Sequence, residues 1–156
     1  MDSFSVDHDI LGEGMYLSKV HEGNNFFTWD LRFVRPNTKL LDPAAVHTIE
    51  HILAVHMRKN LIGKEEVVYF GPMGCLTGFY AVTRNIDKDK VQELLVEAVA
   101  LALVENKVPF GTTKECGSAD FHNLELAKEY LAGYLKVLKD WKGENRFNYP
   151  SAKKGK

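Results

Sequence analysis

Every second residue between Phe27 and Phe33 is apolar, and the residues between them are polar. A β-strand has this two-residue period, so the segment predicts a half-buried strand with Arg32 on its polar face. A strand needs neighbouring strands and a layer that covers its apolar side. The chain must therefore build a sheet, and the rest of the sequence must supply its cover.

The remaining segments divide into strand and helix patterns. Segments 66–70 and 76–83 have the composition of strands, with the turn 71–74 between them. Asp42-Pro43 is typical of a helix start, and apolar residues at helical spacing predict three helices. These helices are expected at about 43–61, from Asp87 or Asp89 to about 106, and at about 123–141. The segment 107–120 is expected to be a loop. This order predicts an α+β fold, with a mostly antiparallel sheet and helices packed on it.

Size and charge narrow the class of protein. A chain of 156 residues that is 45% hydrophobic can bury one core, so we expect a single domain over 1–156 with a frayed tail at about 151–156. A net charge of -1 is not the charge of a nucleic-acid-binding protein. The sequence contains neither a signal segment nor an apolar run long enough for a membrane span. We expect a cytoplasmic protein whose partner is a small molecule or another chain.

The segment His47-Thr48-Ile49-Glu50-His51 places two imidazoles and a carboxylate on one helix face, within an arc of about 100°. Two imidazoles one turn apart can bind a divalent ion, and the carboxylate beside them can move protons. Cys116, in a glycine-flanked loop, is a suitable third ligand. The alternatives are two ordinary histidines and a small buried cysteine.

The other cysteine, Cys75, follows the turn Gly71-Pro72-Met73-Gly74, which can hold its sulfur exposed at the start of a strand. A thiol near a metal or an arginine ionises more easily and can act as a base or nucleophile. A buried structural cysteine is the alternative. His8, His56 and His122 each stand alone in the pattern, and lone histidines are usually structural.

Six segments, in this order, resemble the S-ribosylhomocysteine lyases (LuxS), which make the precursor of autoinducer-2. They are SFSVDH at 3–8, DLRFVRPN at 30–37, HTIEH at 47–51, PMGCLTGFY at 72–80, ECG at 115–117 and HNLELAK at 122–128. The resemblance covers almost the whole chain.

The resemblance implies one divalent metal ion per subunit, iron(II) in the native enzyme and zinc or cobalt in preparations. Its ligands would be His47, His51 and Cys116, with water or a substrate oxygen in the fourth place. The resemblance also implies a homodimer whose two sites lie at the subunit interface.

The resemblance further implies a catalytic thiol at Cys75, a second acid/base at Glu50 and a cation at Arg32 beside the thiol. The positions that it places near the substrate are Ser3, Phe4, His8 and Arg58. The substrate S-ribosylhomocysteine would be cleaved to homocysteine and 4,5-dihydroxy-2,3-pentanedione, by migration of the sugar carbonyl and β-elimination.

This chain departs from the family at 69–71. Many members have an aspartate and a serine before Pro-Met-Gly-Cys, whereas this chain has Tyr69-Phe70-Gly71. Either backbone groups or Tyr69 then replace the polar contact of the aspartate, or the affinity for the substrate differs. The metal and catalytic positions are unaffected.

Two other functions are compatible with parts of the pattern. An inverted zinc peptidase also carries His-x-x-Glu-His, but it would take a glutamate such as Glu125 or Glu129 as its third ligand and would not need Cys116. A metal-stabilised binding module would need neither Cys75 nor Glu50 for its function.

Overall fold

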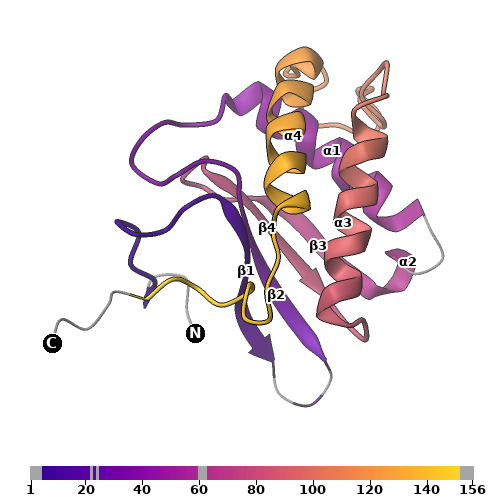
Figure 1. Ribbon diagram of the computed structural model, residues 1–156. Helices are drawn as coiled ribbons and strands as arrows, with labels where there is room; N and C mark the ends of the chain where they lie inside the picture. The colour runs from indigo at the N-terminus through magenta and orange to yellow at the C-terminus, as the bar shows by residue number, and fades with distance from the viewer. Residues whose placement is uncertain (1–4, 22, 24, 60–62, 152–156) are drawn as a thin grey trace, which may run out of the picture.

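The computed structural model describes residues 5–21, 23, 25–59 and 63–151 (Figure 1). Its centre is a four-stranded sheet in the order β1-β2-β4-β3, in which every neighbouring pair is antiparallel. The bounds of the strands are Gly14–His21 for β1, Phe26–Arg32 for β2, Val67–Pro72 for β3 and Gly78–Thr83 for β4. The predicted α+β class is confirmed. Strand β1 was not predicted, because its sequence GMYLSKVH does not alternate regularly.

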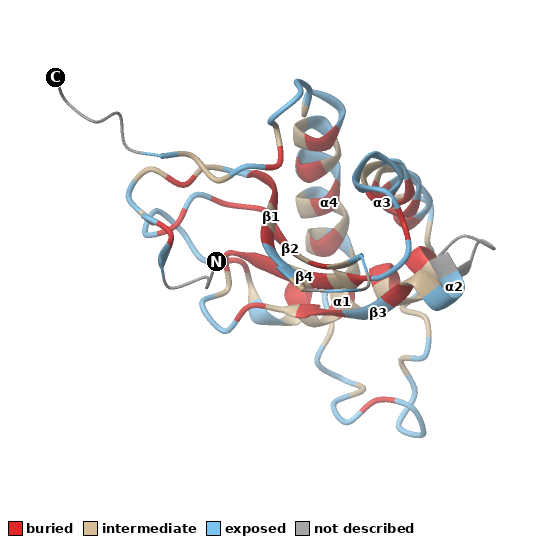
Figure 2. Ribbon diagram, turned by 90° about the horizontal axis from the view of Figure 1, so that it is seen from below, coloured by how far each residue is buried: buried red, intermediate tan, exposed pale blue. Residues whose placement is uncertain are grey.

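Three helices pack on one face of this sheet (Figures 1 and 2). They are α1 at Pro43–Lys59, α3 at Lys88–Ala102 and α4 at Leu124–Lys139, and a short α2 covers Gly63–Glu66. One hydrophobic cluster joins their inner faces to the apolar side chains of β2 and β4. Among the described residues, no helix is long and apolar enough to cross a membrane.

The helix starts follow from local hydrogen bonds. The carboxylate of Asp42 accepts from the Ala45 N–H at 3.0 Å, and the Asn123 side chain accepts from the Leu126 N–H at 3.1 Å. Such caps satisfy amides that have no partner within the helix. Asp87 stands at the N-cap of α3, but its side chain makes no capping bond. The predicted end of the first helix at about 61 lies outside the described residues, as does the tail beyond 151.

The prediction that β2 is half-buried is wrong, because the polar face of this strand is buried too. Asp30 is 1% exposed and Arg32 is 2% exposed. A second, smaller cluster covers this face, formed by Val6, Leu11 and Tyr16 with Trp141 and Tyr149 packed against them. The segments before β1 and after α4 thus bury the ion pair of Asp30 and Arg32, which would otherwise face water.

Candidate metal centre and thiol pocket

Two histidines of α1 present one nitrogen each to a common point. His47 Nδ1 lies 2.6 Å from the Phe121 carbonyl oxygen, and His51 Nδ1 lies 3.0 Å from the Pro109 carbonyl oxygen. A carbonyl can only accept, so each Nδ1 carries the proton and each Nε2 keeps a lone pair. The loop between α3 and α4 therefore orients both imidazoles for metal binding.

The same loop brings Cys116 and His122 to these nitrogens. Cys116 Sγ is 3.5 Å from His47 Nε2 and 3.7 Å from His122 Nε2. The ligand atoms of His47, His51, Cys116 and His122 all lie within 4.8 Å of one another, and this group could hold a metal ion. The sequence pattern predicts the first three residues as ligands but not His122. Its spacing of six residues from Cys116, directly before a helix cap, was the available signal.

His122 is oriented by Thr48, one residue after His47 on α1. The Thr48 hydroxyl has a single proton, and it lies 2.9 Å from the Ala44 carbonyl oxygen, which can only accept it. The same oxygen is then left to accept from His122 Nδ1–H at 3.0 Å and from the Asn123 N–H at 3.0 Å. Burial, followed by the neighbouring His47 and His51, lowers the pKa of His122. The lowered pKa favours the neutral ring, and the hydrogen bond from Nδ1–H to Thr48 leaves the lone pair of Nε2 facing Cys116.

The two sulfur–nitrogen contacts of Cys116 fit a tetrahedral divalent ion. With metal–sulfur and metal–nitrogen bonds of about 2.3 and 2.1 Å, a tetrahedral site separates sulfur from nitrogen by roughly 3.6 Å. The two measured sulfur–nitrogen distances, 3.5 and 3.7 Å, lie on either side of that value. Three imidazoles and a thiolate suit zinc, iron(II) or cobalt(II). Among the described residues the cluster includes no carboxylate, so Glu125 and Glu129 do not supply the ligand that an inverted zinc peptidase needs.

Glu50 lies on α1 one residue before His51 and is half-buried. Its place on the helix, three residues after His47, keeps its carboxylate on the same face as the two imidazoles. It shares the face of α1 that carries two of the cluster residues, but it does not belong to the ligand cluster. A carboxylate in this place can exchange protons with a molecule bound at the centre.

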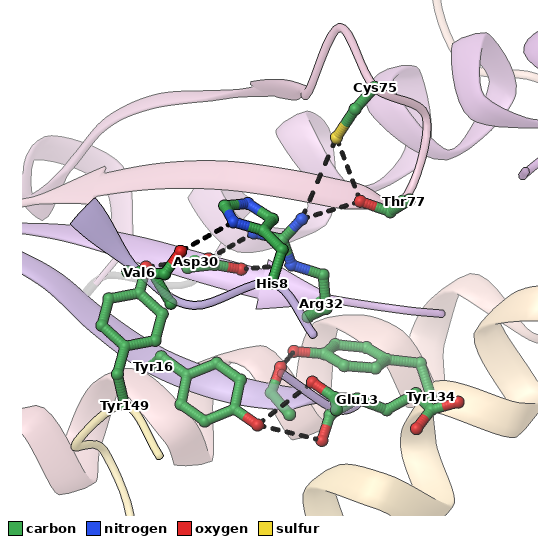
Figure 3. Close-up of polar contacts among 12 residues, drawn as sticks. Val6, His8, Glu13, Tyr16, Asp30, Arg32, Cys75, Thr77, Tyr134 and Tyr149 are labelled. Carbon is green, nitrogen blue, oxygen red and sulfur yellow. Dashed lines mark hydrogen bonds and ion pairs between the residues drawn. The ribbon is translucent and has the colours of Figure 1, made fainter. Parts of the chain in front are cut away.

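Cys75 lies in the turn between β3 and β4 and is exposed. Its sulfur is 3.1 Å from Thr77 Oγ1 and 3.9 Å from Arg32 Nη1 (Figure 3). It opens into a cavity of about 630 Å³, whose wall includes His8 and Tyr80. The thiol is thus accessible to a small molecule and has a cation beside it.

Asp30 fixes the orientation of the Arg32 guanidinium. The carboxylate accepts from Arg32 Nε at 3.1 Å and from Nη2 at 2.6 Å, a bidentate pair that leaves Nη1 for Thr77 at 2.7 Å and for Cys75. Burial by itself would lower the pKa of Arg32, but the hydrogen bond and charge of Asp30 raise it above the ordinary value. The guanidinium is therefore a permanent cation with a fixed direction.

The residues expected near the substrate do not all lie at the Cys75 cavity. His8 lines the cavity of Cys75 and holds its ring by a 2.8 Å contact from Nδ1 to the Val6 carbonyl oxygen. Arg58 donates to the Ala54 carbonyl on α1 and does not line that cavity. Ser3 and Phe4 lie outside the described residues.

Tyr69, one of the alternatives for the contact of the missing aspartate, lies away from the described wall of the Cys75 cavity. Its side chain is 52% exposed and lies over Gly71. Hydrogen-bonding side chains of the cavity come from elsewhere, among them Asn37, Thr77 and Tyr80.

The fold and these two sites define a small α+β protein with a histidine–cysteine cluster able to hold a metal ion and an accessible thiol beside a buried arginine. The sequence profile of the S-ribosylhomocysteinase (LuxS) family matches residues 1–145. The chain belongs to this family.

Curated relatives match over nearly their whole lengths. The S-ribosylhomocysteine lyase of Borreliella burgdorferi (strain ZS7) is 40% identical over 156 residues, covering 95% of this chain and 97% of the relative. The S-ribosylhomocysteine lyase of Phocaeicola vulgatus is 36% identical over 154 residues, covering 96% of each. That of Porphyromonas gingivalis is 35% identical over 153 residues, covering 95% of this chain and 96% of the relative.

Proposed function

We propose that this chain is a metal-dependent S-ribosylhomocysteine lyase. It cleaves S-ribosylhomocysteine to homocysteine and 4,5-dihydroxy-2,3-pentanedione, the precursor of autoinducer-2. The observation that carries this proposal is the cluster of three imidazole nitrogens and one thiol, in a chain of the LuxS family. Substrate and products balance without water, because the thioether bond breaks by elimination.

In this proposal His47, His51 and Cys116 hold one divalent ion, iron(II) in the cell, and a substrate oxygen takes the fourth place. The Nε2 atom of His122 lies beside the same centre. When bound, the ion supplies a Lewis acid that polarises the carbonyl oxygen of the sugar. Both carbonyl contacts of the α1 histidines support this assignment, because they keep the two Nε2 atoms unprotonated. Zinc or cobalt would be accepted by the same donors.

Cys75 and Glu50 carry the proton transfers. The thioether can leave only when a carbonyl stands next to the carbon that loses a proton, so the carbonyl must move from C1 to C3 of the sugar. Each move takes a proton from one carbon and returns one to its neighbour. Glu50 on the metal side and the Cys75 thiolate on the other are the proposed acid/base pair. Arg32 Nη1 places a positive charge 3.9 Å from the sulfur.

We propose a homodimer in the cytoplasm, with both active sites at the subunit interface. The described wall of the Cys75 cavity includes none of the four metal-cluster residues. Apolar side chains are exposed near both sites: Leu40 at the cavity is 68% exposed, and Phe121, which stacks on His47, is 49% exposed. A second chain would cover these side chains and bring its own groups to the substrate. A reducing compartment would keep Cys75 and Cys116 as free thiols.

The deciding experiment measures thiol release. Purified protein of known metal content is incubated with S-ribosylhomocysteine, and free homocysteine is titrated, with Cys75→Ala beside the wild type. We expect release by the wild type and none by the variant, although the variant keeps its metal. No release from metal-replete wild-type protein would refute the lyase assignment. Normal release by Cys75→Ala would remove the thiol from the mechanism.

A further inference from the structure

The buried ion pair of Arg32 and Asp30, next to Cys75, has a third partner, Tyr149, from the segment that follows α4. The Tyr149 hydroxyl donates to Asp30 Oδ2 at 2.8 Å, the same oxygen that accepts from Arg32 Nη2 at 2.6 Å. Figure 3 shows the resulting chain of contacts, which runs from Tyr149 through Asp30 and Arg32 to Cys75 and Thr77. The orientation of Asp30 thus depends on a residue that is 119 positions away in sequence.

Tyr149 is held in this place by the segment that follows α4. The Phe147 carbonyl oxygen accepts from the Leu17 N–H of β1 at 2.8 Å, which fastens the segment to the sheet. The Tyr149 ring stacks on Tyr16 with centroids 5.1 Å apart, and Tyr16 stands opposite Asp30 in the β1–β2 register. In Figure 1 this yellow segment returns from α4 to the region of β1.

The phenol of Tyr149 is a permanent donor. Burial, followed by the charge of Asp30, raises the pKa of Tyr149 far above its ordinary value of 10.0. The hydroxyl therefore keeps its proton at any pH at which the protein works. A donor that stays protonated holds one carboxylate oxygen in a constant direction.

We propose that Tyr149 is a positioning residue for the Cys75 thiol and that it acts through Asp30 and Arg32. Asp30 uses both oxygens on Arg32, so a rotation of the carboxylate would turn the guanidinium and move Nη1 away from the sulfur. Tyr149 opposes that rotation. The inference rests on the proposed role of Cys75 as the reacting thiol.

The test is the rate at which iodoacetamide alkylates Cys75, followed by peptide mass spectrometry so that Cys116 is scored separately. Tyr149→Phe keeps the ring and removes only the hydroxyl. We expect this variant to lower the rate at pH 7 by roughly three- to tenfold, the coupling expected within one hydrogen-bond network. In an Arg32→Met background the same substitution should have no further effect on the rate, because the contact between Arg32 and the Cys75 sulfur is already lost.

The pH dependence separates positioning from general damage. The groups that face the thiol are Arg32 from β2, His8 from the N-terminal segment, Lys39 from the segment before α1 and Tyr80 from β4, with Asp30 behind Arg32. At about pH 10, above the ordinary thiol value of about 8.5, a thiolate needs no help from a cation. Wild type and Tyr149→Phe should then react at the same rate. A variant that had merely loosened the fold would still differ.

Tyr134→Phe is the matched control. It also removes one buried hydroxyl, which donates to the Gly14 carbonyl oxygen at 2.9 Å and does not touch Asp30. Its alkylation rate should equal that of the wild type. A wild-type rate in Tyr149→Phe, or an equal loss in the Arg32→Met background, would overturn the inference. Because alkylation needs no substrate, a failed lyase assay would leave this result independent.

Discussion

Cys116→Ala should greatly weaken metal binding while leaving the fold in place. The sulfur stands 3.5 and 3.7 Å from two imidazole nitrogens and is the single thiol in the cluster of four possible donors. Alanine removes the sulfur and adds no clash. The Cys116 backbone N–H keeps its hydrogen bond to the Thr112 carbonyl oxygen at 2.9 Å, so the loop retains its local support.

The expected loss can be worked from the number of donors. Structural zinc sites bind with about 10–16 kcal/mol at neutral pH. Shared among four donors, this is about 3–4 kcal/mol for each, and a thiolate contributes at least an equal share. The Cys116→Ala substitution should therefore lower the affinity for the ion by a factor of roughly 100–1,000, at about 1.4 kcal/mol for each factor of ten.

The assay is a competition titration against a chromogenic chelator, with metal content measured after dialysis. Cys75→Ala is the matched control, because it makes the same chemical change at a thiol outside the cluster. We expect the control to bind like the wild type and Cys116→Ala to come out of dialysis without metal. Stoichiometric metal at wild-type affinity in Cys116→Ala would refute the assignment of this sulfur as a ligand.

Three further outcomes are expected. Glu50→Gln should bind metal and substrate normally but release homocysteine about 10²–10⁴ times more slowly, and unchanged turnover would contradict its acid/base role. His122→Ala should weaken metal binding about 10–100-fold, less than Cys116→Ala; a wild-type dissociation constant would exclude His122 from the centre. Burial, followed by Asp30, raises the pKa of Tyr16 from 10.0 to about 12, so the folded protein keeps a proton that the unfolded chain loses. Urea unfolding should then show stability falling from pH 10 to 12, and Tyr16→Phe should reduce that slope.

Much of the fold was readable from local patterns. The alternation at 27–33 predicted β2, and helical spacing with Asp42 and Asn123 at the boundaries predicted α1 and α4. These patterns work because side-chain period and capping depend on residues close in sequence. Strand β1 was not predicted, because its register with β2 shifts between Leu17 and Lys19 and this shift breaks the alternation of its side chains.

The residues of the candidate metal site were also only partly predictable from the sequence. His47 and His51 were predictable because one helix turn brings them together, and the family motifs pointed to Cys116. Spacing shows that His122 is near Cys116 in sequence, but it could not predict that the His122 ring faces the cluster, because Thr48 on another element sets its direction. Its place beside Cys116 follows from how the loop folds back on α1.

The sequence by itself determined most of the helices and strands and most of the side chains that carry chemistry. Only the tertiary structure decided that Asp30 and Arg32 are sealed from water and that Tyr149 reaches them. The physical reason is the range of the interactions. Period, caps and motifs act over a few residues, whereas burial and the direction of a hydrogen bond depend on segments that meet only when the chain has folded.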